Sequence, residues 1–334
     1  YVKECDTTRP VTAALAFPEL SNLTGYADAL DVVGYNYKEH LYKDDLAKYP
    51  GRVIYGSENG PGLDAWLAVR DNDAISAQFI WTGIDYMGEA HGWPIRVAQP
   101  GFLDLAGFEK PGYYYRKSLW SDKPTAYLTA SKLGQDDQPA ERRRYGSVPH
   151  WNWNEGDRME VFGYTNCEEA ELFLNGRSLG IKRLADAPRL YLAWEADYEE
   201  GSLQLVARSR SGESCTYELV TASNPSMLQM SIDAAELAAD GQSIAHVELQ
   251  LTDADGNPVY PGEYPVRLSV EGPGEILGLE NGNAQDLEPY SSRSRNTFRG
   301  KLLAYVRTTT EPGRLIVTAE SEGLEPAQAV ITVK

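Results

Sequence analysis

The sequence predicts a multidomain protein whose first part is α/β and whose remainder is all-β. In residues 1–130, short apolar runs alternate with helical stretches, which is typical of βα units around a parallel sheet. In residues 131–334, short segments alternate apolar and polar residues and are separated by turns, which is typical of β-sandwiches. The aromatic composition changes as well, because residues 225–334 contain no tryptophan.

Four apolar runs in the first part have the composition of buried parallel strands. They are Val11–Leu15, Asp31–Tyr37, Arg52–Glu58 and Gln78–Asp85. Helices are expected at His40–Lys48, at Gly62–Asp71 and from Pro111, which suits a first helical turn. A (β/α)₈ barrel takes roughly 250 residues and eight strands. Four strands in this first part therefore predict half of such a barrel, or a sheet that pairs with something else.

Two all-β domains are expected after residue 130, at residues 131–222 and 223–334. The first contains about seven short strands, the number and spacing of an immunoglobulin-like sandwich. Asn175-Gly176 lies between two of them and is a strong signal for a two-residue hairpin. The polar stretch Lys132–Arg144 is interpreted as a linker or exposed loop. The last domain repeats the strand pattern without repeating the sequence.

Charge and composition exclude several classes of partner. The chain has 334 residues, 31 basic and 49 acidic, with a net charge of −18, which argues against nucleic-acid or anionic-membrane binding. No uncharged apolar run approaches the ~20 residues of a membrane helix. Three cysteines are too few for a disulfide framework; Cys167 and Cys215 could pair in an oxidising compartment, although two free thiols are favoured. The four histidines are scattered, so neither a metal site nor a cofactor is expected.

Glu58 is the strongest candidate for chemistry. It ends an apolar parallel strand and is followed by the turn sequence Asn-Gly-Pro-Gly, and in barrels the reacting side chains come from strand C-termini. Capping of that turn or pairing with Arg52 is the structural alternative. Asn36 and Tyr37 end the preceding strand, and Trp81 lies on the next one. An amide, a phenol, a carboxylate and an indole at one mouth suit the recognition of a sugar.

Several runs of this sequence resemble the C-terminal half of glycoside hydrolase family 2 enzymes, in the bacterial beta-galactosidase-like branch. The resemblance spans residues 1–222 in order and rests on the runs RPVTA, DVVGYNY, RVIYGSEN, QFIWTGIDYMGEA, GWP, GFLDLAGFEKPGYYYRKSLW and HWNW…VFGYTNCEEAELFLNGRSLG. The last third resembles the invasin-type, immunoglobulin-like domain that such enzymes often carry. The resemblance implies a retaining exo-glycosidase, the second half of its barrel (strands five to eight) and two sandwiches, often in an exported, periplasmic or extracellular protein.

In that family a glutamate at the end of the seventh barrel strand is the nucleophile, and Glu58 is the matching position. The resemblance further implies that Trp81 lines the sugar subsite and that Asn36 and Tyr37 orient the nucleophile and the sugar. Asp85 and His91 are weaker candidates for contact with sugar hydroxyls. For Asp85, a turn cap or a partner for Arg96 is the favoured alternative.

One element of the family pattern is missing. The general acid/base is a glutamate in an Asn-Glu pair after the fourth strand, and no such pair precedes Val11. A retaining mechanism needs two carboxyl groups. We therefore expect this chain to act on a glycoside or oligosaccharide as part of a longer enzyme, with the other half of the barrel as its partner, and to be inactive by itself.

A non-catalytic carbohydrate-binding or surface-interaction module is the alternative function. Trp151 and Trp153 have the spacing of an exposed aromatic strip, although the same spacing also places both in a core, which is favoured. The sugar, the linkage, the compartment and a possible homo-oligomer stay open.

Overall fold

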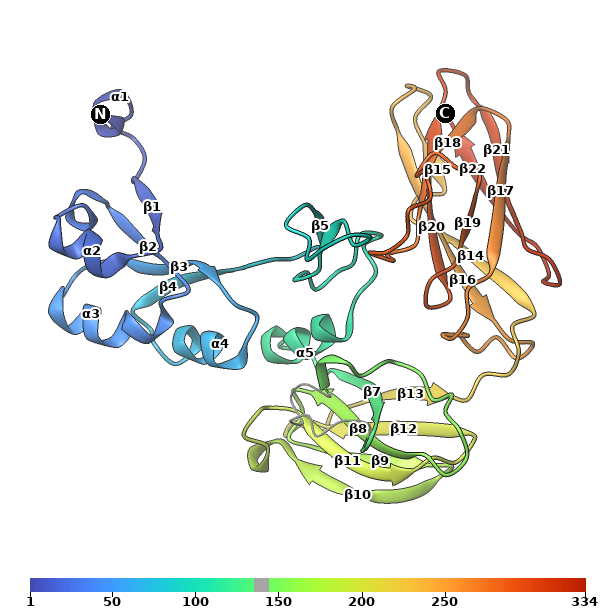
Figure 1. Ribbon diagram of the computed structural model, residues 1–334, viewed down its shortest axis with the longest axis horizontal. Coiled ribbons are helices and arrows are strands. Elements are labelled where there is room, and N and C mark those ends of the chain that lie inside the picture. Colours follow the sequence, from blue (N-terminus) through green and yellow to red (C-terminus); the bar gives the residue numbers. More distant parts are fainter. Residues whose placement is uncertain (135–143) are drawn as a thin grey trace. The chain divides into compact units, whose positions relative to one another are not determined.

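The computed structural model describes residues 1–134 and 144–334, which form two compact units, Tyr1–Gly83 and Ile84–Lys334 (Figure 1). Most of the predicted linker Lys132–Arg144 lies outside the described residues. The chain is mostly β-sheet with few helices, as the alternating segments predict. Among the described residues, no helix is long and apolar enough to cross a membrane.

The first unit is built around four parallel strands in sequential order, β1-β2-β3-β4. Its strands and helices are α1 (Val2–Cys5), β1 (Thr12–Leu15), α2 (Pro18–Leu23), β2 (Val32–Asn36), α3 (Tyr42–Lys48), β3 (Ile54–Asn59), α4 (Leu63–Arg70) and β4 (Ile75–Ile80). Two 3₁₀ turns, Ala27–Ala29 and Glu39–Leu41, precede β2 and α3. The parallel α/β character predicted for this part is therefore present.

Helices cover one face of this sheet. Buried Val33, Tyr35 and Ile54 form a core with Tyr42 of α3 and with side chains of α4. The Tyr35 hydroxyl donates a hydrogen bond to Asp45 in α3 at 2.6 Å, so the polar end of this buried ring has a partner. Because strand side chains alternate between faces, the neighbours of these core residues lie on the opposite face.

The predicted strand Gln78–Asp85 is shifted, because β4 begins at Ile75 and ends at Ile80. Ile80 is paired with Asn59, the last residue of β3, and the ladder ends with the hydrogen bond from the Trp81 N–H to the Asn59 carbonyl. Helices α1 and α2 were not predicted, since both are short and their sequences carry no helical period. The helix from Pro111 is present as α5 (Pro111–Trp120) in the second unit.

The second unit begins with a segment of little regular structure. It contains a small antiparallel pair, β5 (Tyr86–Met87) with β6 (Val97–Ala98), and ends in α5. Ala106 and Phe108 of this segment pack against Leu303, and the Lys301 ammonium lies 4.6 Å from the centre of the Phe108 ring. These contacts attach the segment to the last β-domain.

The next domain is a β-sandwich of two antiparallel sheets, β10-β9-β12-β13 and β11-β8-β7. Its strands are β7 (Ala126–Lys132), β8 (Arg158–Thr165), β9 (Glu169–Leu174), β10 (Arg177–Arg183), β11 (Leu192–Asp197), β12 (Ser202–Arg208) and β13 (Ser214–Val220). The predicted hairpin at Asn175-Gly176 joins β9 to β10, with both residues in the left-handed region. The domain boundary predicted at residue 130 falls within β7, whose alternation AYLTASK is weak. Cys167 and Cys215 are free thiols with their sulfurs 3.9 Å apart.

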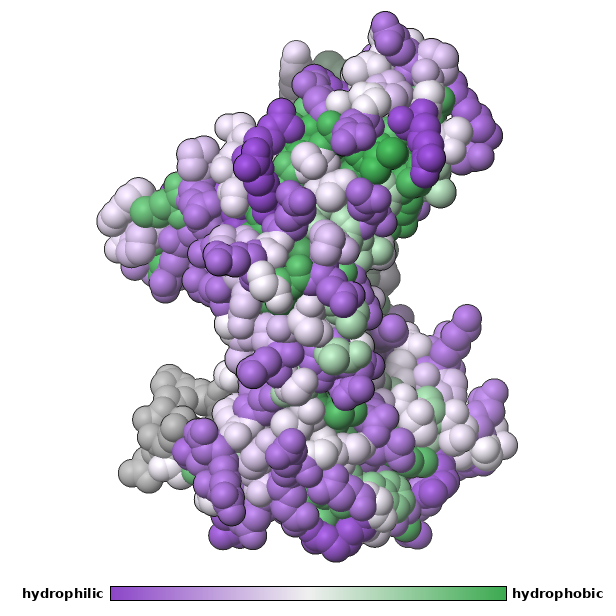
Figure 2. Space-filling view, turned by 90° about the vertical axis from the view of Figure 1, so that its right-hand side faces the viewer, coloured by the Kyte–Doolittle hydropathy of each residue, from purple (hydrophilic) through white to green (hydrophobic). Residues whose placement is uncertain are grey.

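The last domain is a second sandwich, with sheets β14-β16-β20-β18 and β15-β22-β21-β17-β19. Its strands are β14 (Met227–Ile232), β15 (Glu236–Leu237), β16 (Ile244–Thr252), β17 (Pro265–Glu271), β18 (Gly274–Glu280), β19 (Ser294–Asn296), β20 (Lys301–Thr308), β21 (Gly313–Glu320) and β22 (Ala327–Val333). Inward-facing residues of both sheets form one core, including Val247, Leu302, Val317 and Ile331. On the face that Figure 2 shows, hydrophilic residues predominate and hydrophobic ones occur in small areas between them.

Trp151 belongs to the core of the first sandwich. It is fully buried, and its indole N–H donates to the carbonyl of Glu199 at 3.0 Å. Trp153 packs partly buried against the same core. Burial is thus the outcome for this pair, and Trp151 is not available for an exposed aromatic strip.

Replacement of Trp151 should therefore destabilise this sandwich strongly. Trp151→Phe leaves a cavity and an unpaired carbonyl, which should cost about 2–3 kcal/mol of unfolding free energy. Trp153→Phe is the matched control, because its indole nitrogen has no hydrogen-bond partner among the described residues. Chemical denaturation followed by near-UV circular dichroism should show a clearly larger loss for the Trp151 variant than for the Trp153 variant.

Candidate active site

Glu58 lies near the C-terminal end of β3, half-buried at the edge where the parallel strands end. The side-chain amide of Asn36, the last residue of β2, donates to its Oε2 at 3.5 Å. Asn36 and Glu58 are register partners in the β2–β3 pair. The two side chains that the sequence places on neighbouring strand ends are therefore in contact.

The contact depends on an irregularity in the pairing of β2 with β3. Tyr35 is opposite Gly56, whereas Asn36 is opposite Glu58, so β3 carries one extra residue, Ser57. The Ser57 hydroxyl donates to Oδ1 of Asn36 at 2.6 Å. With its oxygen occupied in this way, the Asn36 amide turns its N–H₂ group toward Glu58. Sequence reasoning missed Ser57, because nothing in the local sequence indicates a bulge there.

Glycines make room for this arrangement. A Cβ atom on Gly34 would lie 2.7 Å from the Cβ of Ser57, and one on Gly56 would lie 2.1 Å from Oδ1 of Asn59. Asn59 is fully buried, and its amide nitrogen donates to the hydroxyl of Tyr42 at 3.4 Å. The backbones of β2 and β3 can therefore hold Ser57 and Glu58 in place only because both positions lack a side chain.

Tyr37 and Trp81 are joined to the same strand end through the backbone. The Tyr37 N–H donates to the carbonyl of Glu58 at 2.8 Å, and the Trp81 N–H donates to the carbonyl of Asn59 at 3.0 Å. Tyr37 adopts a left-handed backbone conformation with φ of 52°. Both aromatic side chains are exposed, Tyr37 by 47% and Trp81 by 39%. The ends of β2, β3 and β4 thus present an amide, a carboxylate and two aromatic rings, a combination suited to a sugar ring.

Asp85 lies in the second unit and is engaged in structural contacts. Its side chain is nearly inaccessible; the carboxylate forms an ion pair with Lys110 at 2.7 Å and accepts from the N–H of Gly101 at 2.8 Å. The partner is thus Lys110 and not Arg96, which was the alternative considered from the sequence. These contacts fix the segment that leads to α5.

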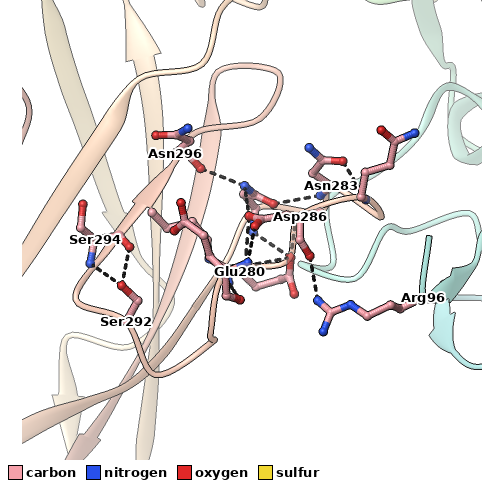
Figure 3. A network of polar contacts seen from close by, with 12 residues as sticks. Arg96, Glu280, Asn283, Asp286, Ser292, Ser294 and Asn296 are labelled. Atoms are coloured by element: carbon pink, nitrogen blue, oxygen red, sulfur yellow. Dashed lines mark hydrogen bonds and ion pairs between the residues drawn. The ribbon is translucent and has the colours of Figure 1, made fainter. Parts of the chain in front are cut away.

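His91 is exposed in the loop between β5 and β6. The end of that loop is attached to the last sandwich, because Arg96 donates to the carbonyl of Asp286 at 2.7 Å (Figure 3). The Asp286 carboxylate is in turn held by the side-chain amide of Asn281 at 2.9 Å and by Arg295 at 3.4 Å. The placement of the loop that carries His91 therefore depends on Asp286 and its partners, which lie almost 200 residues later in the sequence.

Asp104 completes this attachment. Its carboxylate accepts from the N–H groups of Ala106 and Phe108, and a Cβ on Gly282 would lie 2.2 Å from its Oδ2. Burial raises the pKa of Asp104 to about 6, and the nearby acidic groups of Asp85 and Glu280 act in the same direction. The carboxylate thus orders its own loop against the last sandwich. Among the described residues, no group of histidine, cysteine and acidic side chains could hold a metal ion.

Comparison with known proteins matches two regions to family models. Residues 228–330 match "Glycoside hydrolase family 2 C-terminal domain 5", and residues 156–216 match "Domain of unknown function (DUF4982)". Over its whole length the chain is 32% identical to Beta-galactosidase BoGH2A of Bacteroides ovatus, of which it spans 42%. It is 33% identical, over 76% of its length, to a putative beta-glucuronidase of Formosa agariphila, of which it spans 24%.

Solved structures give the same result. A glycosyl hydrolase family 2 member from Bacteroides cellulosilyticus superimposes with a TM-score of 0.89 and 35% identity, over 100% of this chain and 46% of that one. The chain belongs to glycoside hydrolase family 2 and corresponds to a C-terminal part of its members, which confirms the resemblance found in the sequence motifs. It spans less than half the length of these relatives.

Gly56 provides a test of the packing beneath Glu58. Gly56→Ala places a methyl group against the buried Asn59 amide, so the first unit should lose roughly 1–3 kcal/mol of stability. Gly60→Ala is the matched control, since a Cβ there meets nothing within 4 Å and should change stability little. Thermal unfolding monitored by hydrogen exchange in β3 distinguishes the two variants; equal stability of both would contradict this account of the site.

The pH dependence of stability provides a test of how the Asp104 carboxylate is buried in the second unit. Its folded pKa of about 6 lies above the ordinary value of 3.8, so the folded chain binds the proton more tightly, and stability should fall as pH rises through that window. Asp104→Asn keeps the acceptor oxygen and removes the charge. Relative to wild type, the free energy of unfolding of this variant should rise by about 2 kcal/mol between pH 4 and pH 7, measured by denaturant unfolding at each pH. If the difference in unfolding free energy between variant and wild type stayed constant across the pH range, the raised pKa of Asp104 would be refuted.

Proposed function

We propose that the first unit is the second half of a (β/α)₈ barrel in a retaining β-glycosidase. Within residues 1–83, helices cover only one face of the sheet, and Phe79 on the other face is 60% exposed. Among the described residues, strands β1 and β4 are the outer strands of the sheet, and each has one edge without a paired strand. A parallel sheet is ordinarily buried on both faces, and closure with four further strands would cover this face and pair both edges.

Glu58 is the nucleophile in this proposal, and its contact with the Asn36 amide is the observation that carries it. One oxygen of the carboxylate receives the hydrogen bond, which leaves the other to attack the anomeric carbon and form a glycosyl-enzyme. The donor from Asn36 is itself oriented by Ser57, so the carboxylate is held before substrate arrives. Fixed geometry of this kind lowers the barrier because no reorganisation is needed during reaction.

The aromatic side chains would bind the sugar. The ring of Trp81 would pack against the C–H face of the non-reducing-end residue, and the hydroxyl of Tyr37 would reach its oxygens. His91, exposed in its loop, fits a contact with sugar hydroxyls, whereas the buried ion pair of Asp85 fits a supporting role better. His91 and Asp85 are therefore weaker candidates in this proposal than Glu58, Asn36, Tyr37 and Trp81.

A proton donor must come from another part of the enzyme. A retaining mechanism needs a second carboxyl group about 5–5.5 Å from the nucleophile, to protonate the leaving oxygen and then to activate water. The sequence before Val11 lacks the Asn-Glu pair that supplies this group in the family, and the relatives are more than twice as long as this chain. We therefore propose that residues 1–334 alone are inactive or nearly so.

The proposed substrates are terminal β-galactosides. The relative that aligns over the whole chain is named a beta-galactosidase, while another is named a putative beta-glucuronidase. β-Glucuronides are thus the second substrate class to test. Both reactions use the same nucleophile chemistry and differ in the groups that recognise the sugar.

The catalytic proposal is tested with chromogenic β-galactoside and β-glucuronide substrates. Residues 1–334 alone should show no turnover above background. Joined to the N-terminal half of a family 2 relative, the same residues should regain activity, and Glu58→Gln should lower kcat by roughly 10⁴-fold. Asn36→Ala should lower kcat by about 10²-fold, because one oriented donor is lost. Robust turnover by residues 1–334 alone, or full activity of the Glu58 variant, would overturn the proposal.

A further inference from the structure

A second candidate site lies within the unit Ile84–Lys334. It is a cavity of about 300 Å³. Its walls come from α5 and the segment before it, from the first sandwich and from the last sandwich. The aromatic side chains of the wall are Phe108, Tyr114, Tyr127, His150, Tyr217, Tyr260 and Phe298; the tyrosines and His150 carry the argument below.

These rings form two groups in the wall. Tyr114 and Tyr127 are stacked with ring centres 3.5 Å apart, and Tyr127 lies 4.5 Å from Tyr217. The ring of His150, from the first sandwich, lies 5.0 Å from that of Tyr260, from the last sandwich. The volume is that of a small-ligand site, at the lower end of the usual range.

Arg299 stands at the edge of this cavity on an unfavourable backbone. It is the first residue of the two-residue turn before β20 and has φ of 53°, with Gly300 at 75°. Phe298 and Lys301 close the turn through two mutual backbone hydrogen bonds. Asn, Asp or Gly is strongly preferred at such a position, because longer side chains are disfavoured in the left-handed region.

The chain contains the same turn elsewhere with the preferred residue. Asn175 and Gly176, between β9 and β10, have φ of 52° and 76°, nearly the values of Arg299 and Gly300. The backbone therefore does not require arginine at position 299. Left-handed positions that carry a long side chain occur at ligand sites, so the side chain of Arg299 is a candidate for contact with a ligand.

The guanidinium of Arg299 lies over two aromatic rings and has no acidic partner among the described residues. It lies 5.0 Å from the ring centre of Phe298 and 5.9 Å from that of Tyr260. Among residues 1–134 and 144–334, it makes no hydrogen bond or ion pair. Stacking on rings leaves the N–H edge of a guanidinium free to donate.

The charges of the cavity favour a neutral ligand rich in hydroxyl groups. Lys110 and Lys301 line the wall but are paired with Asp85 and Glu248. Three acidic side chains, those of Asp104, Glu109 and Glu218, also line it and would oppose an anion. Aromatic faces, an unpaired donor and carboxylate acceptors together suit the C–H face and the hydroxyls of a pyranose.

We propose that this cavity is a non-catalytic glycan-binding site, in which Arg299 donates to sugar oxygens and the partly exposed rings of Tyr217 and Tyr260 pack against the sugar ring. The choice of a glycan among neutral polyols rests on the proposed function. The site would hold a sugar chain on the β-domains, independently of the carboxylate Glu58.

The test is isothermal titration calorimetry of residues 1–334 with β-1,4-galactotetraose. Arg299→Asn should weaken binding at least tenfold without lowering the melting temperature, because Asn suits the turn. Arg293→Asn, in an exposed loop of the same sandwich that does not line the cavity, is the matched control and should bind as wild type. The tetrasaccharide also ends in a β-galactosyl residue, so the Arg299 and Arg293 variants are compared in a Trp81→Ala background. This substitution removes the aromatic ring of the proposed catalytic subsite and does not alter the lining of the cavity.

Three results would overturn the proposal. The first is the absence of binding to the tetrasaccharide by wild type. The second is unchanged affinity of Arg299→Asn, or a melting temperature of that variant well below wild type, which would give Arg299 a structural role. The third is tight binding of sodium glucuronate or inorganic phosphate without binding of the neutral sugar, which would make the cavity an anion site.

Discussion

The extra residue that β3 carries opposite β2 controls the polar edge of the first unit. Without it, strict alternation would place Ser57 and Glu58 on opposite faces of the sheet, and only one of them could reach Asn36. With it, Asn36 contacts both side chains at once. The glycines at positions 34 and 56 permit this arrangement, because any side chain there would occupy the same space.

A second constraint acts on the irregular segment that follows β4. A segment without regular structure has few ladder hydrogen bonds, so its buried polar groups need side-chain partners. Asp85 with Lys110, and Asp104 with the backbone of its own loop, supply them locally. Arg96 of this segment finds its partner in the last sandwich, where it donates to the carbonyl of Asp286. The last domain thus has a structural role in ordering the segment that carries His91.

Much of the secondary structure could be predicted from the sequence. The helix from Pro111 and the hairpin at Asn175-Gly176 follow from local signals alone. The shifted β4 could not be predicted, because the ends of a strand depend on which neighbour remains to pair with it. The family could also be identified from the sequence, because its motifs occur in order along the chain.

The sequence by itself determined the periodicity of each part, the position of Glu58 at the end of an apolar strand and the membership of glycoside hydrolase family 2. Tertiary structure alone decided that Ser57 orients Asn36, that Asp85 pairs with Lys110 and that Trp151 lies inside a core. The physical reason is that periodicity is a property of neighbouring residues. Register, bulges and ion pairs depend instead on residues that only packing brings together.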